Sequence, residues 1–147
     1  MDSRFIQLIK FFLFMLSVKE RGANFSFYLI EEEKMNTELK KAFAQEMLFA
    51  KKLYKAGDYI KCFGHLERAH ILGQSYVISH TSSHWWMLKV GIKTINIKEV
   101  LGQVMRILAS IVFSRIWVPL GNTGGTNVSP FKPMPIPKEL KKHLENE

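Results

Sequence analysis

Apolar residues recur at steps of three and four along most of residues 37–117, the spacing of helices that bury one face. A first helix is predicted over residues 37–56, with lysines on its outer side and an inner face of Leu39, Phe43, Met47, Ala50 and Tyr54. A second helix follows up to residue 73, with an inner face of Tyr59, Cys62, Phe63, Leu66, Ala69 and Leu72. These two segments predict a helix pair.

Polar residues and glycines mark the ends of this pair. Asn36 or Thr37 can cap the first helix, Gly57 ends it, and Asp58 can cap the second. Gly73 closes the second helix in the same way. The boundaries of both helices are therefore predicted independently of their apolar faces.

Two further helices are predicted downstream. The third is short and lies within SHTSSHWWMLKVG, where serines or Thr81 can cap it and Gly91 ends it. Asn96 and Glu99 stand three residues apart and resemble a capping box that opens the fourth helix, which should run to about Trp117. The expected inner face of this helix is Val100, Val104, Ile107, Ile111 and Ser114.

The last part of the chain differs, because all five prolines lie at or after Pro119. GNTGG predicts a turn, and PFKPMPIP predicts an extended, polyproline-like arm. Pro137 is expected as the first residue of a short last helix. The arm should fold back over the bundle, since Phe131, Met134 and Ile136 would be costly to leave in water.

The predicted fold class is all-α, since no segment has a convincing strand pattern. Residues 35–118 are expected to form a compact bundle of about four helices, and residues 119–147 the Gly/Pro-rich arm with its short helix. Residues 1–34 are predicted to be an apolar N-terminal extension. Its core, Phe5 to Val18, is shorter than the roughly 20 residues of a membrane span. The alternatives for it are a mis-start before Met35, a signal-like or membrane-surface segment, and a packed helix.

Composition and charge add a few bounds. The chain has 147 residues, 47% apolar and 23% charged, which fits one folded domain. Its net charge of +8 arises entirely after residue 34, because that part of the chain has 16 basic and 8 acidic side chains. The single cysteine, Cys62, excludes a disulfide framework and a cysteine-based zinc ribbon, which favours a cytoplasmic location. The alternative is membrane association through the N-terminal apolar segment.

The helix pair around Gly57 resembles one tetratricopeptide repeat. The matching small and aromatic positions are Ala50, Gly57, Asp58, Tyr59 and Ala69. Cys62 and His70 depart from the pattern, and no second copy follows at the period of a solenoid. The resemblance implies a helical hairpin with an interaction groove.

A second resemblance covers roughly Met35 to Leu144. The segments HLERAHILGQ, HWWML, GQVMRI, GNTGGTNV and PMPIPKEL are similar to those of an uncharacterised family of small bacterial proteins, known as a domain of unknown function. That family brings no activity to carry over. Residues 1–34 lie outside the resemblance.

Histidine and glutamate spacing raises the hypothesis of a metal site. The alternative is that Glu67 pairs with Arg68 or a lysine and that His70 donates to a carbonyl in the core. Positions five apart are rotated by about 140° on a helix, so His65 and His70 do not share an ion, whereas Glu67 and His70 do share a face. His80 and His84 are four apart and also compatible with one ion. With Glu46 expected to point inward, the candidate ligands are Glu46, Glu67, His70, His80 and His84. This mixed set suits zinc, iron or manganese, and Glu99 and Gln103 offer further oxygens.

The alternative function is a metal-free module that binds a protein partner through a groove or through the basic face of Lys51, Lys52 and Lys55. Sequence-specific nucleic-acid binding is not expected, because no recognition pattern accompanies the lysines. Weak membrane association through residues 5–18 is another expectation. Cys62 and His65 could form a thiolate pair, and GNTGG could form a phosphate nest. A buried cysteine and a structural turn are the favoured interpretations, and no catalytic constellation is legible.

Overall fold

The computed structural model describes residues 34–113 and 119–145, without the side chains of residues 111–113. Its helices are α3 (Thr37–Ala56), α4 (Tyr59–Gly73), α5 (Val77–Lys93), α6 (Ile97–Phe113) and α7 (Lys138–Leu144). Every regular element in these ranges is a helix, which confirms the all-α prediction. The predictions for the N-terminal extension and for the end of the fourth helix near Trp117 fall outside the described residues.

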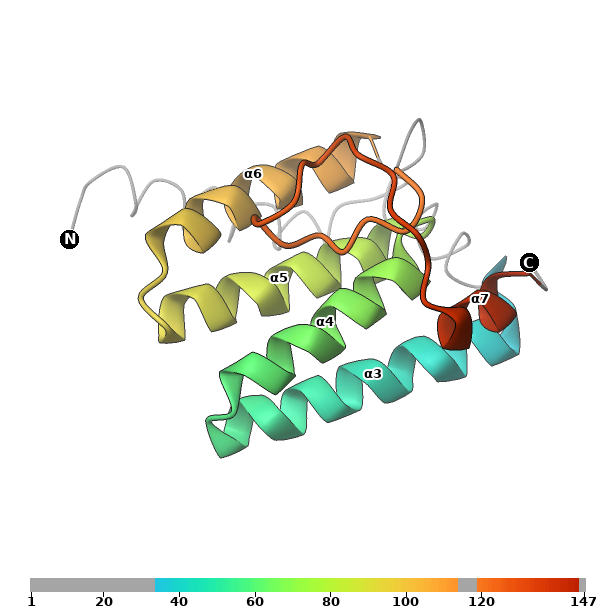
Figure 1. Cartoon of the computed structure of the whole chain (residues 1–147), viewed down its shortest axis with the longest axis horizontal. Coiled ribbons are helices and arrows are strands. Elements are labelled where there is room, and N and C mark those ends of the chain that lie inside the picture. Colours follow the sequence, from blue (N-terminus) through green and yellow to red (C-terminus); the bar gives the residue numbers. More distant parts are fainter. Residues whose placement is uncertain (1–33, 114–118, 146–147) are drawn as a thin grey trace, which may run out of the picture.

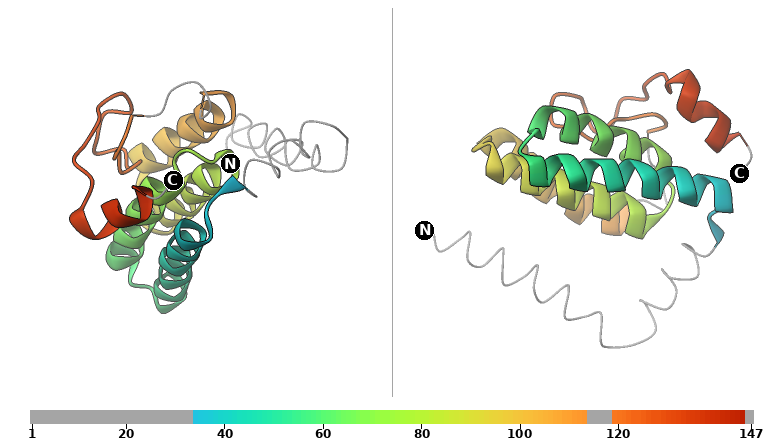
Figure 2. Two further views of the ribbon diagram at one scale, coloured as in Figure 1. Left: turned by 90° about the vertical axis from the view of Figure 1, so that its right-hand side faces the viewer. Right: turned by 90° about the horizontal axis from the view of Figure 1, so that it is seen from below.

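The four long helices lie side by side in chain order, each running opposite to its neighbour (Figure 1). α7 packs against α3 and α4. The arm that leads to α7 lies on the same side of the helices as α7 itself (Figure 2). Among the described residues, no helix has the length and hydropathy needed to cross a bilayer.

The α3–α4 hairpin forms at the predicted boundaries. The Asn36 side chain accepts from the Leu39 N–H at 2.8 Å, and Asp58 accepts from the Lys61 N–H at 3.1 Å. Gly57 ends α3 at φ +79°, where its N–H bonds back to carbonyls of the last turn. These local contacts explain why sequence caps located this hairpin correctly.

The helix α5 is longer than predicted at both ends. It begins at Val77 after Tyr76, with no side-chain cap, so Ser79, His80 and Thr81 lie inside the helix and not in a cap. The expectation that Gly91 ends it was also wrong, since α5 continues to Lys93. Gly91 serves packing instead, because a Cβ there would lie 3.3 Å from the Glu99 side chain of α6.

The inner face of α6 is more polar than predicted. Asn96 caps the Glu99 N–H at 3.0 Å as expected, but the Glu99 carboxylate turns to Gln103 and Thr126 and completes no capping box. The buried positions are Glu99, Gln103, Ile107 and Ser110, whereas Val100 and Val104 are half-buried. The side chains of Ile111 and Ser114 lie outside the described residues. A polar stripe therefore faces α5 and the arm.

Two apolar clusters hold the helices together. One lies among α3, α4 and α5 and comprises Met47, Ala50, Cys62, Leu66, Ala69, Met87 and Val90. The other joins α7 to the start of α3 and the end of α4 and comprises Met35, Leu39, Ile71, Leu72 and Leu140. Burial raises the pKa of the Cys62 thiol to about 11, so this cysteine is a core residue and not a thiolate.

The arm folds back only in part as expected. Ile136 packs against the second cluster and Met134 is half-buried, but Phe131 stays exposed. Pro137 is the N-cap of α7 and not its first residue. The prediction for Phe131 was wrong because the arm is held by polar contacts to α4 and α6, which do not need its side chain.

Candidate metal centre

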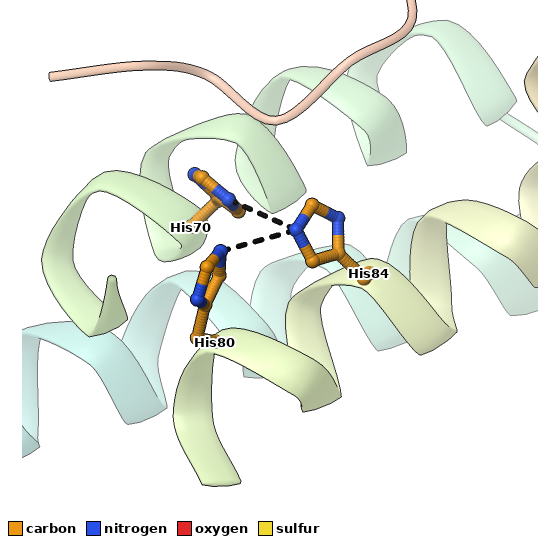
Figure 3. Close-up of side chains that lie close together, drawn as sticks. All are labelled: His70, His80 and His84. Carbon is orange, nitrogen blue, oxygen red and sulfur yellow. Dashed lines mark hydrogen bonds between the residues drawn. The ribbon is translucent and has the colours of Figure 1, made fainter. Parts of the chain in front are cut away.

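Three buried histidines from two helices meet inside the bundle. His70 comes from α4, and His80 and His84 come from α5; each is 7% exposed or less. The Nε2 atom of His84 lies 3.2 Å from Nε2 of His70 and 3.1 Å from Nε2 of His80. Figure 3 shows the three rings pointing toward one another, with one nitrogen of His84 near both His70 and His80. One ring nitrogen of each lies within 4.8 Å of the others.

Helix spacing and close packing place these rings. His80 and His84 are four residues apart, so they lie on one face of α5, one turn above the other. α4 approaches α5 closely at Gly73, where a Cβ would lie only 2.8 Å from the Ser79 Cβ. The small residues beside His70 and His80 therefore bring the two helices near enough for the rings to meet.

Outer hydrogen bonds fix which ring nitrogen of His84 carries the proton. The Gln103 amide nitrogen donates to Glu99 Oε1 at 2.6 Å and to the Gly124 carbonyl at 2.9 Å, both of which are acceptors. Its oxygen therefore faces His84, and His84 Nδ1 donates to it at 2.7 Å. The proton of neutral His84 is thus on Nδ1, and the lone pair on Nε2 points into the cluster.

The same logic holds for His70. Its Nδ1 donates to the Asn122 carbonyl at 2.8 Å, so its Nε2 also carries a lone pair. Two lone pairs consequently face each other across the 3.2 Å between His70 and His84. Neutral rings cannot turn this contact into a hydrogen bond, and a cation between the nitrogens would satisfy both.

Protonation is opposed by the surroundings. Burial lowers the pKa of His70 and of His84 well below the usual value for histidine, and neighbouring rings lower it further. Burial, followed by the positive charge of Arg106, lowers the pKa of His80 to about 4. The three imidazoles are therefore neutral at pH 7, which is the form that binds metal ions.

The GNTGG segment closes the site from the arm. Besides Asn122, its Gly124 carbonyl accepts from Gln103, and Arg106 of α6 donates to the carbonyls of Gly125 (3.2 Å) and Val128 (2.8 Å). Gly124 has φ +80°, and a Cβ there would lie 2.5 Å from the His70 ring. The segment acts through its carbonyls, so the structural-turn interpretation fits better than a phosphate nest.

The structure brings together three of the five candidate ligands and separates two. Glu46 is not part of the three-histidine cluster, because both of its carboxylate oxygens contact other side chains of α4. Its Oε2 lies 2.6 Å from His65 Nδ1, and its Oε1 accepts from Arg68 at 2.8 Å. Glu67 also lies outside the histidine group, facing the arm at Gly125. Burial raises the pKa of its carboxyl, and the charge of Glu99 adds to the rise.

The remaining sequence candidates fall into supporting or separate positions. Glu99 and Gln103, considered as oxygen donors, support His84 from behind instead of joining the cluster. Lys51, Lys52 and Lys55 are exposed on α3, with the Lys51 ammonium 5.5 Å from the Trp86 ring centre.

Sequence reasoning missed the roles of Asn122, Gly124 and Arg106. Glycines and an asparagine predict a turn, but nothing in their spacing predicts that the turn carbonyls meet a histidine more than fifty positions away. The one available indication was that GQVMRI and GNTGGTNV both belong to the segments that characterise the resemblance.

The arrangement has the donor set of a nitrogen-rich metal site. Imidazole nitrogens 2.0–2.1 Å from a tetrahedral zinc ion lie about 3.3 Å apart, close to the 3.1 and 3.2 Å of the two pairs that involve His84, and the third pair lies within 4.8 Å. Ligating histidines usually donate their other N–H to a carbonyl or similar acceptor, as His70 and His84 do here. Three protein ligands leave a further coordination position for water or another ligand.

Comparison with known proteins places the chain in a family without assigning an activity. Neither the curated proteins nor the solved structures gave a match. One family matches residues 37–144, which span α3 to α7 and include all three histidines. The chain therefore belongs to the family described as Protein of unknown function (DUF3703).

Proposed function

We propose that this protein binds one transition-metal ion through the Nε2 atoms of His70, His80 and His84. The observation that carries the proposal is the facing pair of lone pairs on His70 and His84. The Asn122 carbonyl and the Gln103 amide oxygen hold both rings in that tautomer. A buried contact between two acceptors is unfavourable without a cation, and the low pKa values of both rings make a proton a poor substitute.

The chemistry of the ligand atoms restricts which metal ions fit the site. Three neutral imidazoles suit zinc, copper, nickel or iron, whereas manganese prefers carboxylate and water oxygens. Glu46 and Glu67 lie outside the histidine group. The protein ligands of the proposed site are therefore nitrogen atoms alone, and not the mixed nitrogen and oxygen atoms expected from the sequence. Zinc fits best among these metals, since it accepts a tetrahedral site of three histidines and one exchangeable ligand.

The metal content of the purified full chain tests this function. The protein, expressed without an affinity tag in medium containing zinc, iron, nickel, copper and manganese, should hold about one equivalent of metal, mainly zinc. The variant His80→Ala/His84→Ala should be metal-free, because it removes both ligands from α5. Elemental analysis by mass spectrometry measures the content, and circular dichroism shows whether the variant remains helical.

The matched control is His65→Ala. His65 lies on the same helix as His70, but its Nδ1 contacts Glu46 and takes no part in the cluster. This variant should retain the metal content of the parent. Substoichiometric metal in the parent, or equal loss in His65→Ala and the double variant, contradicts the proposed function.

A further inference from the structure

One end of the bundle exposes isoleucines. The α3–α4 and α5–α6 turns lie at the same end of the helices (Figure 1). Four isoleucines at or beside these turns project into solvent: Ile60 (88% exposed), Ile92 (50%), Ile95 (84%) and Ile97 (69%). We call this set, with the lysines described below, the turn end. Single exposed apolar residues are ordinary, but four at one end mark an interaction surface.

The backbone at Ile95 strengthens this interpretation. Ile95 has φ +53°, the one non-glycine residue with positive φ among those described. Left-handed backbone is unfavourable for a β-branched side chain, and asparagine or glycine would adopt it at lower cost. An isoleucine held in a strained turn and exposed to water contributes little to the core, so the fold alone does not account for it.

The charges around these isoleucines are almost all positive. Lys52 and Lys55 at the end of α3 and Lys93 and Lys98 beside the α5–α6 turn are exposed and form no ion pair with described residues. The acidic groups described here are Asp58, which pairs with Lys61 at 3.0 Å, and Glu99. Glu99 is buried and bonded to Gln103 and Thr126, so it faces away from solvent.

The opposite end of the bundle is built differently. There three basic side chains are paired: Lys41 with Glu38 (3.0 Å), Arg68 with Glu46 and Glu139 (2.8 and 2.7 Å), and Lys141 with Glu145 (3.3 Å). Among the residues that the structure describes, the exposed isoleucines therefore occur together with unpaired lysines at the turn end.

We propose that the turn end docks on an anionic lipid surface. Apolar side chains beside unpaired lysines are the combination that binds membrane interfaces: the apolar groups enter the acyl boundary while the ammonium groups remain among anionic headgroups. The charge complementarity selects lipid headgroups as the partner. This surface lies on turns that carry no ligand of the histidine cluster, so the proposal is independent of metal binding.

Vesicle sedimentation of the full chain tests the proposal. The protein should sediment with vesicles of phosphatidylcholine containing phosphatidylglycerol, weakly with phosphatidylcholine alone, and less as salt is raised. Ile95→Asn should weaken binding to the anionic vesicles by roughly tenfold, because it removes one apolar side chain that enters the acyl boundary in the docked state. Asparagine tolerates positive φ, so this variant should unfold at the same or a higher denaturant concentration, which separates lost docking from lost folding.

Charge reversal provides a second test of the proposal, with a matched control. Lys93→Glu/Lys98→Glu should weaken binding at least tenfold, because it removes two attractive headgroup interactions and adds two repulsive charges. Lys40→Glu/Lys138→Glu makes the same charge change at the starts of α3 and α7, at the opposite end, and should bind like the parent. All variants keep residues 1–33, so any contribution of those residues to binding is the same in every variant. Equal binding by parent, Ile95→Asn and both charge variants overturns the proposal, as does an equal loss in the two charge variants.

Discussion

Zinc at a thousand times its Kd is expected to raise the free energy of unfolding of the full chain by about 4 kcal/mol, and to leave His84→Ala unchanged. A ligand that binds only the folded state stabilises it by mass action, and His84 Nε2 lies within 3.2 Å of both other ring nitrogens. Denaturant unfolding followed by circular dichroism, with and without zinc, measures the difference. Because each variant is compared with itself, the cost of the cavity left by His84→Ala does not enter.

His65→Ala serves as the control for this measurement. It removes a histidine from the same helix as His70 while leaving the cluster intact, so its zinc-dependent stabilisation should equal that of the parent. An equal zinc effect in parent and His84→Ala would show that zinc acts elsewhere on the chain and would contradict the site.

Gly124→Ala is expected to destabilise the metal-free protein by about 3 kcal/mol and to weaken zinc binding. A Cβ at Gly124 would lie 2.5 Å from the His70 ring, on a backbone at φ +80°. The left-handed conformation costs an alanine about 1 kcal/mol and the overpacking about 2 kcal/mol. The arm must then move away from His70, which breaks the bond from His70 to the Asn122 carbonyl.

Gly57→Ala separates these two costs. Gly57 has nearly the same φ, +79°, but a Cβ there meets nothing within 4 Å. This variant should lose about 1 kcal/mol and keep the zinc affinity of the parent. Denaturant unfolding and calorimetric zinc titration of both variants provide the comparison. Equal destabilisation by the two alanines, with zinc affinity unchanged in both, would mean that the arm does not hold His70 in place.

Much of the fold could be predicted from sequence because its determinants are local. Asn36, Gly57 and Asp58 end or begin helices through bonds that span three or four residues, so their effect is visible in the spacing alone. The pairing of His80 with His84 is local in the same sense. The predicted start of α5 failed because its first turn has a buried Val77 and no side-chain cap.

The rest of the site depends on contacts between distant segments. Hydrophobic periodicity chose Val100 and Val104 for the inner face of α6, whereas the structure buries Glu99 and Gln103 more deeply. A polar side chain can be buried when partners satisfy it, and here those partners are His84 and the arm. Glu46 shows the reverse case: it is largely buried as expected, but Arg68 and His65 turn it toward α4.

The central claim, a single ion held by three imidazole nitrogens, is tested most directly by X-ray absorption at the zinc edge of the zinc-loaded full chain. The claim predicts a first shell of nitrogen or oxygen atoms only, at about 2.0–2.1 Å, with outer-shell scattering from three imidazole rings. It also predicts the same spectrum for His65→Ala. A sulfur shell at about 2.3 Å, or outer-shell scattering from no more than one imidazole, would contradict it.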